Sequence, residues 1–180
     1  MDETKILPAT WKTAISQLLK QPTSRSGNLP RIAVLGVGNL IRSDDAAGVL
    51  VARGLSQREC AARRDRVLII EAGQAPENRT GELRRFSPDL VLIVDAAEMG
   101  EKPGTTQLID QESIDGMSAS THSLPLSMLA RYLVLELGCT VKLLGIQLDS
   151  NEVGEGVSPG VLQAVNQIVD ELDTLFRSVD

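Results

Sequence analysis

The segment Ile32–Asp45 reads IAVLGVGNLIRSDD. Its first seven residues, Ile32–Gly38, form a continuous apolar run rich in β-branched side chains, which is typical of a strand buried on both faces. Asp44 and Asp45 follow at the expected start of a helix that continues to about Glu59, where acidic residues are favoured. A buried strand, a turn and a helix in this order indicate an α/β domain with parallel strands.

Further runs of residues predict the other strands of the same sheet. Three of them are apolar, as is typical of further buried strands, and a fourth alternates as a short edge strand would. They are VLIIEAG (Val67–Gly73), LVLIVDAA (Leu90–Ala97), VKLLGIQ (Val141–Gln147) and the alternating TTQLID (Thr105–Asp110). We therefore expect one three-layer α/β domain, phosphorylase/hydrolase-like, with a twisted, mostly parallel central sheet and helices on both faces.

Helical periodicity separates these strands. It is found around residues 76–86, from Pro125 to Leu137, and from Ser158 to Arg177, where Pro159 suits the first helical turn. Residues 1–30 are expected to form an N-terminal helix and a polar linker, and residues 31–180 the domain proper. The helix would run from about Thr10 to Lys20 and pack on the domain edge, with a partner-binding arm as the alternative.

Composition excludes several classes of function. The 180 residues carry 18 Lys and Arg against 24 Asp and Glu, a net charge of −6, so the main driving force for nucleic-acid binding is missing. No apolar run reaches the roughly 20 residues that cross a bilayer. The first residues, MDETKILPA, lack the pattern of a secretory signal, so we expect a cytoplasmic protein. Cys60 and Cys139 are too far apart for a local metal or redox pair.

The glycines after the first strand resemble part of a dinucleotide-binding motif. Gly36 and Gly38 match its first two glycines, and Glu71 ends the second strand where a ribose-binding acid could lie. The third position is Ile41 rather than Gly, so close helix–strand packing is not provided there. Acidic side chains at the helix start would also repel a phosphate. Nucleotide binding is therefore a minor alternative.

A serine-hydrolase motif is also incomplete. The segment Gly116–Ser120 begins like G-x-S-x-G, but Ser120 replaces the second glycine and no strong strand precedes it. What remains is a set of two acids and the only histidine: Asp45 at a helix start, Asp95 at a strand end and His122 before a helix. Such a set could hold a divalent transition metal with positions left open. The alternative is that Asp44 and Asp45 only cap a helix, that Asp95 bonds loop amides and that His122 is a surface residue.

Five motifs, taken together and in order, resemble the [NiFe]-hydrogenase maturation endopeptidases, most closely the hydrogenase 3 type that serves formate hydrogenlyase. They are GVGNLIRSDDAAG, EAGQAPEN, LVLIVDAAEMGEKPG, STHSLPLSMLA and LLGIQ, and the similarity extends from about Arg31 to Arg177. Ser43 and Ala46 depart from the pattern, because the family often has glycine at the first position and usually at the second.

The resemblance implies a function. Members of this family remove a short C-terminal peptide from the hydrogenase large-subunit precursor after nickel insertion, and they are classed as aspartic-type peptidases. Asp45, Asp95 and His122 match the catalytic and nickel-recognising trio, and the nickel is that of the client's centre. The resemblance further suggests substrate-binding roles for six residues that line the same cleft: Gly36, Gly38, Asn39, Gln74, Glu77 and Asn78.

The expected partner is therefore the large-subunit precursor, with no nucleic acid, no membrane insertion and a monomeric enzyme. The competing class is a non-catalytic module that senses nickel with the same three residues. We also expect Asp45 and Asp95 to lie at exposed ends of their helix and strand rather than in the core.

Overall fold

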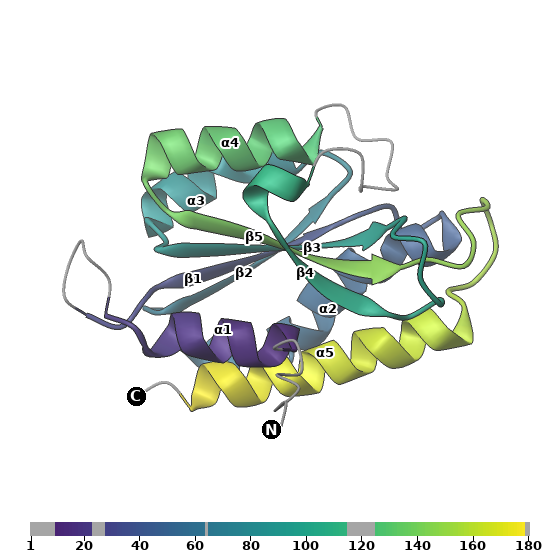
Figure 1. The fold of residues 1–180 in the computed structure, drawn as a ribbon, viewed down its shortest axis with the longest axis horizontal. Helices are drawn as coiled ribbons and strands as arrows, with labels where there is room; N and C mark the ends of the chain where they lie inside the picture. The colour runs from purple at the N-terminus through teal and green to yellow at the C-terminus, as the bar shows by residue number, and fades with distance from the viewer. Residues whose placement is uncertain (1–9, 23–27, 64, 115–124, 179–180) are drawn as a thin grey trace, which may run out of the picture.

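A computed structural model describes residues 10–22, 28–63, 65–114 and 125–178. Within these residues, five strands and five α-helices (Figure 1) are joined by loops and by short 3-10 helices, which are here called η. In chain order they are α1 (Trp11–Lys20), β1 (Ile32–Val37), η1 (Ser43–Ala46), α2 (Ala47–Ser56), η2 (Glu59–Ala62), β2 (Val67–Gly73), η3 (Pro76–Arg79), α3 (Thr80–Phe86), β3 (Leu90–Ala97), β4 (Thr106–Asp110), η4 (Gln111–Ser113), α4 (Leu126–Leu137), β5 (Thr140–Gln147) and α5 (Pro159–Arg177).

The strands form a single sheet in the order β2-β1-β3-β5-β4. Four of them run parallel, and β4 pairs antiparallel with β5 at one edge. This confirms the predicted mostly parallel sheet and its short edge strand. The second strand is less buried than its sequence suggested, because β2 lies at the opposite edge: Leu68 and Ile69 are only half-buried, and Glu71 is exposed.

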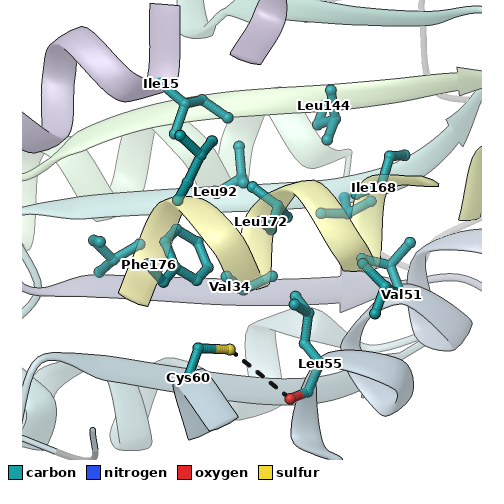
Figure 2. Packing of buried hydrophobic residues seen from close by; sticks show 14 of the residues in the cluster. Ile15, Val34, Val51, Leu55, Cys60, Leu92, Leu144, Ile168, Leu172 and Phe176 are labelled. Atoms are coloured by element: carbon teal, nitrogen blue, oxygen red, sulfur yellow. Dashed lines mark hydrogen bonds between the residues drawn. The ribbon is translucent and has the colours of Figure 1, made fainter. Parts of the chain in front are cut away.

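Helices cover both faces of the sheet, with α1, α2 and α5 on one side and α3 and α4 on the other (Figure 1). Each central strand sends alternate side chains to the two layers, as the two-residue period of a strand requires. In β1, Val34 packs with α2 and α5, whereas Leu35 packs with α3 and α4. Figure 2 shows the first of these clusters, where Leu172 and Phe176 of α5 lie against the sheet.

The N-terminal helix α1 packs into the same cluster. Its side chains Ile15 and Leu19 are fully buried, and Trp11 and Leu18 pack beside them. Thr10 caps the helix by accepting a hydrogen bond from the Thr13 amide at 3.4 Å. The predicted packing of this helix on the domain edge agrees with these contacts, while the division of the chain at residue 30 stays a prediction.

The helix predicted from Asp44 to about Glu59 is divided into three pieces, η1, α2 and η2. Ser43 has a positive φ of 35°, so a regular helix cannot begin before it. The terminal helix is as expected, with Ser158 as its N-cap and Pro159 in its first turn. Among the described helices, none is both long and apolar enough to span a membrane.

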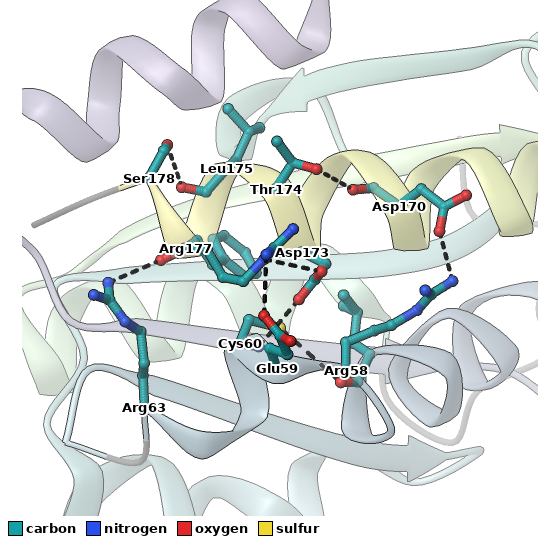
Figure 3. A network of polar contacts seen from close by, with 12 residues as sticks. Arg58, Glu59, Cys60, Arg63, Asp170, Asp173, Thr174, Leu175, Arg177 and Ser178 are labelled. Atoms are coloured by element: carbon teal, nitrogen blue, oxygen red, sulfur yellow. Dashed lines mark hydrogen bonds and ion pairs between the residues drawn. The ribbon is translucent and has the colours of Figure 1, made fainter.

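The C-terminal end of α5 is held by a network of polar contacts (Figure 3). Buried Asp173 accepts a hydrogen bond from the Cys60 amide at 3.0 Å and forms an ion pair with Arg177 at 3.2 Å. Arg177 also pairs with Glu59 at 3.0 Å, and Arg63 donates to the Phe176 carbonyl at 3.3 Å. Burial, and then the neighbouring Asp173 carboxylate, raise the pKa of the Cys60 thiol to about 12. This network fastens η2 to α5.

Candidate functional site

Glycines bring α2 directly against the carboxyl ends of β1 and β3. A Cβ atom on Gly48 would lie 2.0 Å from the Val94 carbonyl oxygen and 2.3 Å from that of Val37. A Cβ atom on Gly36 would lie 2.3 Å from the Gly48 carbonyl oxygen. Both distances are far below van der Waals contact, so only glycine fits. The close helix–strand packing that Ile41 could not provide is therefore present, supplied by Gly36 and Gly48 instead.

Gly38 fixes the turn that follows β1. Its φ of 133° favours glycine, and a Cβ atom there would lie 1.8 Å from the Asp45 carbonyl oxygen. The next amide, that of Asn39, donates to the same oxygen at 3.0 Å, and the Gly38 amide donates to the Gly73 carbonyl at 3.1 Å. The turn after β1 therefore contacts both η1 and the end of β2. Gly36, Gly38 and Asn39 shape this part of the carboxyl edge, whereas their contact with a substrate stays a prediction.

Asp45 and Asp95 both lie at this carboxyl edge, and both are buried. Asp45 is 5% exposed and Asp95 is 0% exposed, so the expectation that they lie at exposed ends is wrong. Asp95 follows Val94, the residue whose carbonyl faces Gly48, and Asp45 lies three residues before that glycine. The packing of η1 against β3 explains the burial and brings together the two segments that carry these acids.

Glu77 belongs to the same edge. It lies in η3, which begins shortly after β2 ends, and its Oε2 atom is buried, as are the Oδ1 atoms of Asp45 and Asp95. Gln74 and Asn78 lie beside it with exposed side chains. Carboxylates from three separate segments, η1, β3 and η3, thus lie along this edge of the sheet.

His122 lies outside the described residues, as does the segment Gly116–Ser120. The structure therefore places two of the three members of the predicted trio. Within residues 10–22, 28–63, 65–114 and 125–178, no group of three His, Cys, Asp or Glu side chains is arranged to hold a metal ion. The donors that are described, carboxylate oxygens, fit a divalent metal, and an imidazole would complete a mixed N/O set.

Asp44 has a role that the sequence did not reveal. Its carboxylate accepts hydrogen bonds from the amides of Asp149 at 2.8 Å, Ser150 at 3.0 Å and Ser158 at 2.7 Å, and from the Ser158 hydroxyl at 3.0 Å. Burial alone would raise its pKa, but these four hydrogen bonds outweigh burial and lower it. Asp44 therefore holds the loop between β5 and α5 against η1, rather than capping its own helix.

Gln147 fixes the segment that follows β3. Its side chain is 3% exposed, and its Oε1 atom accepts from the amides of Met99 at 2.7 Å and Glu101 at 3.2 Å. Its Nε2 atom donates to Glu98 Oε1 at 3.1 Å and to the Leu148 carbonyl at 3.0 Å. A glutamine that ends an apolar strand was the only sequence signal for this role.

A groove of about 870 Å³ lies elsewhere, between α1 and β4. Its lining includes Trp11, Leu108 and Lys142, the last in an ion pair with Asp110. None of the buried acids described above lines this groove. We therefore place the candidate site at the carboxyl edge of the sheet, where ligands bind in open α/β sheets.

Comparisons with known proteins identify the family of this chain. The family model of the hydrogenase maturation protease HycI matches residues 49–174. The hydrogenase 3 maturation protease of Escherichia coli is 39% identical over 117 residues, which cover 64% of this chain and 72% of that protein. The crystal structure of the [NiFe] hydrogenase maturation protease HycI from Thermococcus kodakarensis superimposes with a TM-score of 0.78 at 30% identity, over 92% of this chain and 99% of that one.

A second solved structure gives the same result. The solution structure of the endopeptidase HycI from Escherichia coli has a TM-score of 0.68 at 34% identity, over 80% of this chain and 90% of that one. The fold described above is therefore the fold of these enzymes.

Proposed function

This chain belongs to the hydrogenase maturation proteases, and from that premise we propose that it removes the C-terminal peptide of a [NiFe]-hydrogenase large-subunit precursor after nickel insertion. The observation that carries the proposal is the burial of Asp45 and Asp95 on neighbouring segments at the carboxyl edge of the sheet. Buried acids favour a cationic partner, because a cation offsets the cost of removing their charges from water. A precursor that already contains nickel presents such a cation.

In this proposal Asp45, Asp95 and His122 contact the client's nickel. These three side chains orient the client. The nickel is part of the substrate, and in that position it can polarise the carbonyl group of the peptide bond beside it. Rigid elements hold both acids, since Gly48 locks α2 against β3 and Gly38 locks the turn against Asp45. Fixed ligands of this kind accept a cation with little rearrangement, which favours the loaded precursor over the empty one.

Gln74, Glu77 and Asn78 are proposed to contact the polypeptide next to the cut, because η3 places them at the same edge. We further propose that the enzyme is an aspartic-type peptidase. Its two acids, Asp45 and Asp95, act by contacting the metal rather than as a pair that activates water. The proposal also includes a cytoplasmic location and a monomeric enzyme, which fractionation and sedimentation would check.

The test is processing of nickel-loaded and nickel-free precursor, followed by mass spectrometry for the loss of a peptide of a few kilodaltons. Asp45→Asn, Asp95→Asn and His122→Ala should each lower the cleavage rate at least about a hundredfold, because each removes a group that touches the reacting assembly. Asp173→Asn is the matched control. It neutralises another buried acid, which lies near the C-terminal end of α5 and away from the candidate site. Normal cleavage by the Asp95→Asn enzyme, or equal cleavage of empty precursor, would contradict the proposal. Binding of loaded precursor without any cleavage would identify a non-catalytic nickel sensor.

A further inference from the structure

Three large apolar side chains are exposed beside the candidate site. Leu40 and Ile41, in the turn after β1, are 48% and 66% exposed, and Val153, in the loop before α5, is 61% exposed. Exposed apolar side chains are unremarkable when they are scattered. These three are not scattered, because the two segments that carry them lie side by side.

Backbone and side-chain hydrogen bonds join the two segments. Arg42 and Val153 form an isolated antiparallel bridge, and the Gly154 amide donates to the Ile41 carbonyl at 3.1 Å. The Arg42 guanidinium donates to Asn151 Oδ1 at 2.8 Å. The apolar side chains therefore project from a fixed framework, which reduces the entropy lost when a partner binds.

The same framework continues into the candidate site. Ser43 donates through its hydroxyl to the Gly156 carbonyl at 3.0 Å, and Asp44 binds the amides of the same loop. The Asp45 amide donates to the Arg42 carbonyl at 2.9 Å. A polypeptide seated on Ile41 would thus be only a few residues from Asp45.

The charge around these side chains is negative. Asp149, Glu152 and Glu155 are exposed on the loop before α5. The basic side chain in this framework, Arg42, is engaged with Asn151. Apolar surface with acidic neighbours complements a segment that carries large apolar side chains and lysine or arginine. A second copy of this chain fits poorly, because the acidic groups would face one another.

We infer that Leu40, Ile41, Glu152 and Val153, here called the rim, bind the precursor through a segment that contains large apolar and basic side chains. This inference rests on the proposed function, because the precursor is the polypeptide that must reach Asp45 and Asp95. The rim determines affinity for the client, whereas the buried acids act on the bond to be cut. Changes in the rim should therefore raise KM and leave kcat nearly constant.

The experiment measures KM and kcat for cleavage of nickel-loaded precursor by Ile41→Ser, Val153→Ser and Glu152→Lys enzymes. Each apolar change should raise KM about tenfold, because a central interface side chain commonly contributes that much. Glu152→Lys should raise KM about threefold or more at low salt, and this effect should shrink as ionic strength rises. Leu135→Ser, a 77% exposed apolar residue on α4, and Asp65→Lys, just before β2, are the matched controls.

The outcomes separate the rim from the proposed function. If the parent enzyme cleaves and all three rim variants keep the parent KM, the rim inference is wrong and the proposed function stands. If the parent does not cleave loaded precursor, the proposed function itself fails. A change in sedimentation rather than in KM would make the rim an interface between copies and overturn the inference. Ile41 and Val153 lie on different segments, so misfolding of one variant, detected by circular dichroism, leaves the other as the test.

Discussion

Helix α5 is held at both ends by a buried aspartate, but the two ends are built from different partners. At its start, Asp44 accepts only from neutral donors, three backbone amides and one hydroxyl. At its end, Asp173 accepts from the Cys60 amide and pairs with Arg177, which is itself about half-exposed and shared with Glu59. Backbone donors are fixed in place, whereas long cationic side chains are mobile and screened by salt. The N-terminal end of α5, which borders the candidate site, is thus held more rigidly than its C-terminal end.

The largest expected effect comes from Asp44→Ala. Removing this carboxylate leaves three amides without their acceptor in a largely buried place, so the free energy of unfolding should fall by about 3 kcal/mol. Cleavage of loaded precursor should fall as well, because the loop that Asp44 holds carries part of the rim. Urea unfolding measures the first effect. Asp149→Ala changes an exposed acid of the same loop and should alter stability by less than about 0.5 kcal/mol.

Loss of the buried aspartate at the C-terminal end of α5 should destabilise the protein less than loss of Asp44 does. Asp173→Ala removes one amide contact and a partly exposed ion pair, so we expect a loss of about 1–2 kcal/mol. Processing of the precursor should be unchanged below the melting temperature, because neither η2 nor the end of α5 reaches the carboxyl edge. If Asp173→Ala destabilised the protein as strongly as Asp44→Ala, the contrast between the two ends would be refuted.

The stabilising contacts at the two ends of α5 should also differ in how strongly they depend on salt. The stability lost in Arg177→Ala should be below about 1 kcal/mol at low ionic strength and should nearly vanish in about 1 M NaCl, where the Debye length is only about 3 Å. The cost of Asp44→Ala should change little with salt, since its partners carry no net charge. Chemical unfolding with urea, an uncharged denaturant, at two salt concentrations distinguishes the two behaviours.

At neutral pH the smallest expected effect concerns Cys60. Its folded pKa of about 12 exceeds the ordinary value of 9.0, so the folded state keeps the thiol proton longer than the unfolded state does. This contribution to stability is present below pH 9 and is lost as pH rises from about 9 towards 12. A Cys60→Ala protein should lack that alkaline decline. At pH 8 iodoacetamide should modify Cys60 only after unfolding, and rapid labelling of the folded protein would contradict its burial.

The fold could be predicted because most of its signals are local. Apolar runs such as Ile32–Gly38 and Leu90–Ala97 identify strands, and Pro159 marks the start of the last helix. The partly exposed β2 was overestimated as a buried strand, because an apolar run does not say which strand lies at the sheet edge. Strand order depends on contacts between distant segments, which periodicity cannot report.

The candidate site was predicted in part. Residue type and position pointed to Asp45 and Asp95, whose roles stay a prediction, yet their burial depends on the contact between η1 and β3. Asp44 was interpreted as a helix cap, because its partners lie more than 100 residues later and leave no local pattern. Gly48 was overlooked for a similar reason, since only the approach of β3 makes a side chain there impossible. His122 lies outside the described residues, so its role stays a prediction.

The hydrogen bonds of Asp44 also have a consequence for biosynthesis. A ribosome makes β1 and η1 early, whereas the amides of Asp149, Ser150 and Ser158 emerge only after all five strands have been synthesised. Until then the nascent chain contains both candidate acids but lacks the loop that completes their surroundings and carries Val153. Closing this long-range contact is entropically costly and therefore late in folding. The surroundings of the candidate site are therefore complete only once the domain itself is complete.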